Sequence, residues 1–243
     1  MPWGLWSTVG FSCVIGAVCL VCGILFVLVL VVLARIRNPH LDIEQFGGSL
    51  EKNGLFLAGL ICVIATPAVG LILLFARIRR NITVRQYLSL YNPGWRQVCK
   101  WSLVLVLYAA VVEAVNFVLT FAGRPFTSEV MIRLYSSAQL VPLLWFAMVV
   151  IAPVSEELFF RGFLFKGVES SRMGPVGAVI VTSLVWSVLH AQLDVFALAG
   201  TFVGGLLLGW ALLKTRSVYI PIIMHAIWNL IATIEVAVYL KLV

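Results

Sequence analysis

The residues most suited to chemistry are two adjacent carboxylates, Glu156 and Glu157, followed by Arg161 at the end of a long apolar run. Neighbouring residues on a helix point about 100° apart, so the two carboxylates face different directions. Glu157 and Arg161 are four residues apart with the acid first, which is the favourable order for a helical ion pair. This spacing predicts one carboxylate neutralised by Arg161, and one left free to act as a general base. The plainer alternative is a helix end whose charges are solvated.

Two further polar pairs follow at helical spacing. Trp186 precedes His190 by four residues and His225 precedes Asn229 by four residues, so each pair shares one helix face. A single His or Asn in a membrane is often a packing residue that hydrogen-bonds to a neighbouring helix. A carboxylate, two imidazoles and an amide on successive polar helices instead supply a base, a second base and oxyanion donors. Together they predict a hydrolytic site.

The composition places these groups in a membrane. Of 243 residues, 62% are hydrophobic and 11% are charged, and the mean hydropathy is +1.08. A soluble domain has about 25% charged residues and needs polar residues to cover its surface. The sequence therefore excludes a soluble globular protein, a disordered tail and a secreted disulfide scaffold. It predicts a polytopic membrane protein with lipid around it and no nucleic-acid partner, and its five cysteines are expected to be small apolar helix residues.

Seven nearly uncharged runs are candidate membrane spans, since a helix needs about 20 apolar residues to cross the hydrocarbon core. They are 1–34, 53–76, 101–123, 134–155, 173–193, 195–213 and 217–240. The fourth run extends to about residue 165, and a break at Pro142 or Pro153 would give eight helices. Such long apolar runs are unlike barrel strands. The predicted fold is all-α, a polytopic transmembrane bundle of 7–8 helices.

Lys and Arg predict the orientation. The segment 77–100 holds six of them, more than the neighbouring loops, and is expected to be cytoplasmic together with the N-terminus. No Lys or Arg precedes the first apolar run, which is too long for a cleavable signal and is expected to remain as a span. We expect residues 1–130 to form N-terminal helices with this basic loop. Residues 131–243 are expected to form a catalytic core within the same membrane domain.

The order and spacing of the motifs resemble the CPBP family, which comprises type II CAAX prenyl endopeptidases and bacteriocin-processing and self-immunity proteins. The resemblance covers about residues 150–232. It rests on Ala152-Pro153, Glu156-Glu157-x-x-x-Arg161, Trp186-x-x-x-His190, His225-x-x-x-Asn229 and the segments 205–210 and 217–225. This chain has Trp186 where the family usually has Phe, and we expect the change to affect packing more than chemistry.

The resemblance implies an intramembrane endopeptidase acting on a membrane-associated protein or peptide. By motif matching, Glu156 and His190 would activate a water, while His225 and Asn229 would stabilise the oxyanion. The supporting residues would be Glu157, Arg161 and Trp186. The resemblance implies no cofactor. The small size and short loops favour a bacterial cell membrane as the location.

Three alternatives remain open at this point. In the first, zinc is held by Glu156, His190 and His225, because three protein ligands and a water make a catalytic zinc site. In the second, the protein is a non-enzymatic immunity factor or scaffold. The third is a transporter, suggested by polar residues in other spans, namely Glu113, Asn116 and Glu235.

Overall fold

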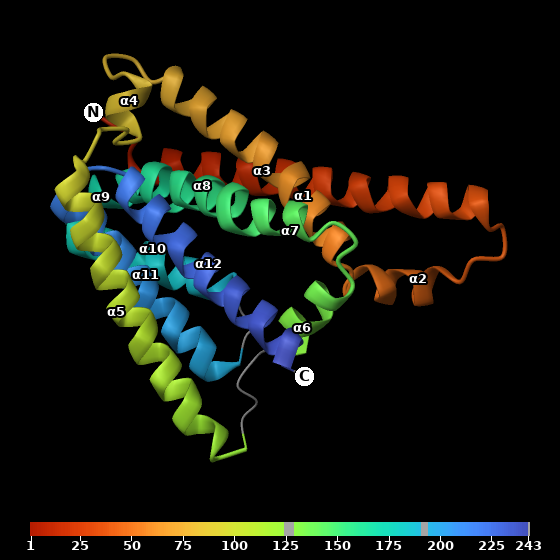
Figure 1. The fold of residues 1–243 in the computed structure, drawn as a ribbon. Helices are drawn as coiled ribbons and strands as arrows, with labels where there is room; N and C mark the ends of the chain where they lie inside the picture. The colour runs from red at the N-terminus through yellow and green to blue at the C-terminus, as the bar shows by residue number, and fades with distance from the viewer. Residues whose placement is uncertain (124–128, 191–193, 243) are drawn as a thin grey trace.

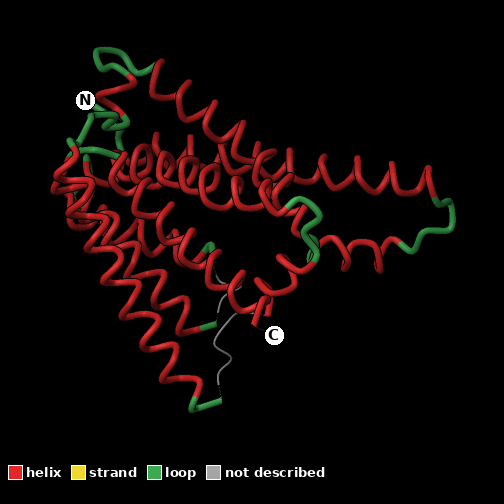
Figure 2. The backbone as a smooth tube through the Cα atoms, viewed as in Figure 1, coloured by secondary structure: helices red, strands yellow, loops and turns green. Residues whose placement is uncertain are grey.

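The computed structural model describes residues 1–123, 129–190 and 194–242, and all regular elements in these ranges are helices (Figures 1 and 2). The long helices are α1 (Leu5–Arg37), α3 (Gly54–Arg77), α5 (Trp95–Thr120), α11 (Val195–Thr215) and α12 (Tyr219–Leu242). The shorter ones are α2 (Ile43–Leu50), α4 (Val84–Tyr87), α6 (Glu129–Ser136) and α10 (Gly174–Val188). The predicted all-α fold is confirmed. Lipid favours it, because a helix satisfies its own backbone polar groups.

One continuous helical rod, residues 141–169, runs through the bundle and is called the central rod below. It consists of α7 (Val141–Phe146), the π-helical segment η1 (Ala147–Ile151), α8 (Ala152–Glu157), the π-helical segment η2 (Leu158–Leu164) and α9 (Phe165–Glu169). The rod packs against α3 and α12 along much of its length, and α10 and α1 contact its later part. The two carboxylates of the predicted site therefore lie between two π-helical segments, which often occur at functional sites.

Six helices are long and apolar enough to cross a bilayer: α1, α3, α5, the central rod, α11 and α12. Helix α10 is also apolar but has 15 residues, short of the about 20 that a full crossing needs. Its predicted run extended to residue 193, and residues 191–193 lie outside the described residues. The structure thus places an apolar helix in each predicted run and describes a multi-pass membrane protein.

The fourth run is divided just before Pro142, since α6 ends at Ser136 and the central rod begins at Val141, but it is not divided at Pro153. Pro142 lies in the first turn of α7, where the missing N–H costs nothing. Pro153 lies two residues after the end of η1, in which hydrogen bonds already reach back five residues, as from the Ala152 N–H to the Ala147 carbonyl. The π register therefore accommodates this proline without breaking the helix, and the break before Pro142 separates the short helix α6 from the rod.

Local signals explain several helix ends. Asn53 caps α3 by accepting from the Phe56 N–H, and Asp194 caps α11 by accepting from the Phe196 and Ala197 N–H groups. At the other end of α11, Arg216 has φ of 55°, a left-handed conformation that terminates the helix. These caps fix where α3 and α11 begin, and α11 brings a glycine-rich face to the site.

Candidate active site

A buried ion pair lies at the centre of the predicted site. Arg161 Nη1 donates to Glu157 Oε1 at 3.0 Å, and both side chains are fully buried. His225 Nδ1 on α12 lies 2.9 Å from the same carboxylate oxygen. Since a carboxylate oxygen accepts, the proton of this bond lies on Nδ1 of His225. The predicted Glu157–Arg161 pairing is present, and it reaches a third predicted residue that lies 68 positions away in the sequence.

The neighbouring carboxylate points to a different partner. Glu156 Oε2 accepts a hydrogen bond of 2.7 Å from the indole Nε1 of Trp186 on α10. His190 Nδ1 lies 2.9 Å from the Trp186 carbonyl, which can only accept, so this imidazole also carries a proton on Nδ1. Nε2 of His190 is therefore the nitrogen left for other partners. In the described part of the chain, no hydrogen bond joins Glu156 directly to His190. Trp186 contacts both, Glu156 through its indole N–H and His190 through its backbone carbonyl.

Trp186 joins the two groups of residues. Its ring centroid lies 5.1 Å from that of His190 and 5.2 Å from that of His225, both in edge-to-face geometry. The Arg161 guanidinium lies 4.9 Å from the centre of the indole ring, a cation–π distance. The central rod, the turn that follows α10, and α12 therefore place Glu156, His190 and His225 around one tryptophan.

Asn229 is held one turn beyond His225 on α12. Its Nδ2 donates to the Met148 carbonyl in η1 at 2.8 Å. In the five-residue register of η1, the backbone donor for that carbonyl would be residue 153, but proline has no N–H. The Met148 carbonyl is therefore free to orient the Asn229 amide. An amide nitrogen has two N–H groups, so the second is left for a ligand.

The glycine-rich face of α11 lets the helices approach closely. A Cβ on Gly204 would overlap the Trp228 ring, and one on Gly205 would lie 3.1 Å from the Trp186 ring. The Gly205 carbonyl also accepts from Arg161 Nη2 at 3.1 Å. A side chain at position 204 would displace the Trp228 ring, whereas one at position 205 would require small shifts of Ser183 and the Trp186 ring.

Two buried polar atoms at the centre of the cluster have no hydrogen-bond partner among the described residues: Glu157 Oε2 and Arg161 Nε. Buried polar atoms are nearly always hydrogen-bonded, so such a pair calls for an explanation. A polar ligand or a water that contacts both atoms would satisfy one acceptor and one donor. The cluster thus combines a free acceptor, a free donor and two imidazoles at a place that apolar helices surround.

Sequence reasoning identified all the side chains of this cluster but missed three of its interactions. No sequence pattern identifies the first two, which are made by the carbonyls of Met148 and Gly205, because a backbone carbonyl has the same chemistry at every position. The third is the indole N–H of Trp186. The Trp-for-Phe difference drew attention to this residue, but the expectation that it changes packing more than chemistry was incomplete, since Phe has no donor for Glu156.

The zinc alternative is not supported by the arrangement. Among the described residues, no group of three His, Cys, Asp or Glu side chains is placed to hold a metal ion. Instead Glu156 is bonded to an indole N–H and His225 to a second carboxylate.

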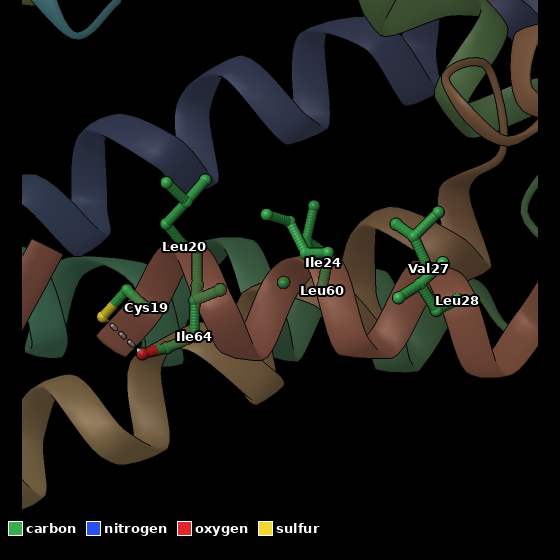
Figure 3. Close-up of a pocket in the computed structure, with 8 residues that line it drawn as sticks. Cys19, Leu20, Ile24, Val27, Leu28, Leu60 and Ile64 are labelled. Atoms are coloured by element: carbon green, nitrogen blue, oxygen red, sulfur yellow. Dashed lines mark hydrogen bonds between the residues drawn. The ribbon is translucent and has the colours of Figure 1, made fainter. Parts of the chain in front are cut away.

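A separate groove of about 490 Å³ lies between α1 and α3, and none of its lining residues belongs to the polar cluster (Figure 3). Its lining is apolar and includes Leu20, Ile24 and Leu60, together with Cys19, whose thiol donates to the Ile64 carbonyl. All five cysteines are unpaired, in line with their expected role as small helix residues. The described residues that line the groove include no carboxylate or imidazole to serve as a base, so the candidate active site is the cluster around Trp186.

Comparison with known proteins agrees with the motif-based resemblance. Residues 138–231, which contain every side chain of the cluster, match the family model of Rce1-like type II CAAX prenyl endopeptidases. The uncharacterized protein YyaK of Bacillus subtilis (strain 168) is 27% identical over 160 residues, 64% of this chain and 50% of YyaK. The chain thus spans about half the length of this curated relative. No solved structure matches the chain.

Proposed function

Because residues 138–231 match the family model of Rce1-like type II CAAX prenyl endopeptidases, we propose that this multi-pass membrane protein is an intramembrane glutamic-type endopeptidase. Its substrate would be a membrane-associated protein or peptide. The observation that carries the proposal is the partition of the two adjacent carboxylates. Glu157 is neutralised by Arg161 and His225, whereas Glu156 is half-buried and bonded only to an indole N–H among the described residues. Glu156 is therefore the carboxylate available as a base.

In this mechanism Glu156 accepts a proton from a water that attacks the scissile carbonyl, and Nε2 of His190 helps to hold that water. The peptide carbonyl becomes a tetrahedral oxyanion. As it collapses, the bond to nitrogen breaks and the proton on Glu156 passes to the leaving amine. A carboxylate can both accept and return a proton in this way, and such general acid–base catalysis increases the reaction rate by about 10²- to 10⁴-fold.

The oxyanion would be stabilised by His225 and by the second N–H of Asn229. Nδ1 of His225 already donates to Glu157, so an N–H on Nε2 requires the doubly protonated imidazolium. Glu157 is placed to stabilise that cation, as the acid of a catalytic triad stabilises its histidine. This gives Glu157 a second task besides its ion pair with Arg161.

Glu156→Gln tests the proposal. The protein is reconstituted in nanodiscs and assayed with a synthetic prenylated CAAX peptide and with its non-prenylated counterpart. In a second experiment, mass spectrometry identifies the membrane proteins that accumulate uncleaved in cells carrying the variant. Glu156→Gln is expected to reduce turnover at least about 100-fold at unchanged expression. Glu113→Gln, which removes another half-buried carboxylate on α5, is the matched control and is expected to retain activity.

Full activity of Glu156→Gln would contradict the proposal. Loss of ion flux in proteoliposomes on changing Glu113, with no peptide cleavage by the wild type, would favour the transporter alternative. A cellular phenotype that survives the double change Glu156→Ala and His190→Ala would favour the non-enzymatic immunity or scaffold alternative.

We further propose that the N-terminal end of the bundle is cytoplasmic, in a bacterial cell membrane. Arg79 Nε donates to the Met1 carbonyl, and Ser170 to the Trp3 carbonyl, so the N-terminus lies beside the 78–94 loop and the end of the central rod (Figure 1). Ten Lys or Arg lie at this end: Arg77, Arg79, Arg80, Arg85, Arg96, Lys100, Lys166, Arg172, Lys214 and Arg216. In the described part of the chain the acid at this end is Glu169. Such an excess of positive charge is typical of a cytoplasmic face.

Helix α12 starts at this end and carries the C-terminus to the opposite side. With the other cysteines replaced by Ala, a membrane-impermeant maleimide added to intact cells should label a Cys appended to the C-terminus. It should label Cys99, at the start of α5, only after the membrane is opened. The reverse pattern would overturn the proposed orientation.

A further inference from the structure

Trp186 differs from the other aromatic residues near the site in the number of polar groups that it touches. It is 3% exposed, its indole Nε1 donates to Glu156, and its backbone carbonyl accepts from His190. The face of its ring is covered by the Arg161 guanidinium. The backbone contact is one that any residue type can make, whereas the N–H contact to Glu156 depends on the indole.

Resting on the proposed function, we propose that Trp186 is a positioning residue for the catalytic base: its indole N–H fixes the Glu156 carboxylate and leaves one oxygen free for the water. A glutamate side chain has three rotatable bonds, and the last of them turns the carboxylate freely. A bond of 2.7 Å to Oε2 removes that freedom. Oε1 then becomes the oxygen that accepts the proton of the attacking water.

The indole can do this because it is itself held on several sides. Its ring contacts the Arg161 guanidinium and forms edge-to-face pairs with two imidazoles, and α11 presents Gly205 where a Cβ would lie 3.1 Å from the ring. A rigid donor costs no additional entropy when the base must be aligned, which is the physical basis of preorganised catalysis. The glycine also provides the room that the second ring of a tryptophan needs.

The contribution has a predictable size. Hydrogen bonds to charged groups are worth more than those between neutral groups. Loss of the indole N–H is therefore expected to lower kcat by about 10- to 100-fold. Because Trp186 acts on Glu156 and not on the substrate, KM should stay within about twofold of the wild-type value.

Three variants test this in the full-length protein in nanodiscs, with the prenylated CAAX peptide as the probe. Trp186→Phe removes the N–H and one ring. Site-specific incorporation of 3-(3-benzothienyl)alanine at position 186 keeps both rings and replaces the N–H with sulfur, so it separates the hydrogen bond from the packing. Trp101→Phe is the matched control, since Trp101 is buried in the same apolar cluster and its Nε1 has no hydrogen-bond partner in the part of the chain that the structure describes.

Support for the proposal is a loss of kcat of about 10- to 100-fold at unchanged KM in both position-186 variants, with Trp101→Phe close to wild type. Wild-type kcat in the benzothienyl variant would overturn it, even if Trp186→Phe failed to fold. An equal loss in Trp101→Phe would overturn it as well, because the effect would then be general packing. The proposed function fails separately, through an active Glu156→Gln variant.

Discussion

Helix α1 and the central rod are both long and apolar enough to cross a bilayer, but their surroundings differ. The most apolar stretch of α1 has a mean hydropathy of 3.3 and none of it is buried, whereas that of the rod has 1.8 and a third of it is buried. Side chains along α1 such as Leu25 and Val29 face outward. The rod instead carries Glu156, Glu157 and Arg161 against α10 and α12.

Of these two helices, the one with the lower mean hydropathy is the one that lies inside the bundle. Lipid accepts apolar side chains at no cost, so α1 needs few specific contacts. A charge within the membrane must be paired or hydrogen-bonded, so the polar side chains of the rod require neighbours that supply partners. Four substitutions, on the rod or on elements near it, test whether stability and activity depend on this part of the bundle more than on α1. They are given from the largest expected effect to the smallest.

The largest effect is expected at the buried ion pair. Glu157→Ala leaves the Arg161 charge buried without its carboxylate, and breaking a buried pair in this way costs about 3–5 kcal/mol. Unfolding in mixed micelles measures the free energy. Leu25→Ala on α1 is the matched control and should change it little. A loss in Leu25→Ala as large as that in Glu157→Ala would contradict the contrast between the two helices.

A smaller loss is expected on the glycine face that packs against the site. Gly204→Ala would push the Trp228 ring aside, and overpacking of this kind costs about 1–3 kcal/mol. Gly16→Ala on α1 has no atom within 4 Å of the new Cβ and should instead add about 0.5–1 kcal/mol through helix propensity. The same unfolding assay compares the two variants. Changes of the same sign in their free energies of unfolding would contradict the contrast between α1 and the helices at the site.

Pro153→Ala should affect activity more than stability. The new N–H at residue 153 would compete with Asn229 for the Met148 carbonyl and release the amide. We expect kcat to fall about tenfold, equivalent to about 1.4 kcal/mol, while the free energy of unfolding stays the same or rises. Pro67→Ala inside α3 is the control for a helix proline outside the site and should leave kcat unchanged. If Pro153→Ala lowers kcat further in an Asn229→Ala background, the proposed link through Asn229 is wrong.

The smallest effect is a pH dependence at Tyr87, in the loop helix α4, which stacks on Phe163 of the rod at 5.7 Å between ring centroids. Burial raises the pKa of the Tyr87 hydroxyl to about 12 from its usual 10.0. The folded state then holds this proton more tightly than the unfolded state, so stability is retained below pH 10 and decreases between pH 10 and 12. The free energy of unfolding of Tyr87→Phe should decrease less over this range than that of wild type. Tyr91→Phe, at an exposed position, should follow the wild type.

Much of the architecture was predictable because its signals are local. Apolar runs indicated where the spans lie, and the four-residue spacing of Glu157 and Arg161 predicted their ion pair. The continuity of the central rod was not predictable. It depends on η1, whose wider turn accommodates Pro153, and a π-helical register has no composition of its own. The 15-residue length of α10 was also hidden within a longer apolar run.

By itself, the sequence determined the class of protein, the positions of its apolar helices and the side chains of the candidate site, because composition and helical periodicity act within a few residues. Tertiary structure decided which of these residues meet. The contact of Glu156 with Trp186 joins residues 30 apart, that of Glu157 with His225 residues 68 apart, and that of Met148 with Asn229 residues 81 apart. Such contacts depend on how each helix is rotated and how closely it packs. The glycines of α11 and the π-helical segments of the rod set the rotation of the helices and the closeness of their packing. They do so through backbone geometry, which the identity of a single residue does not encode.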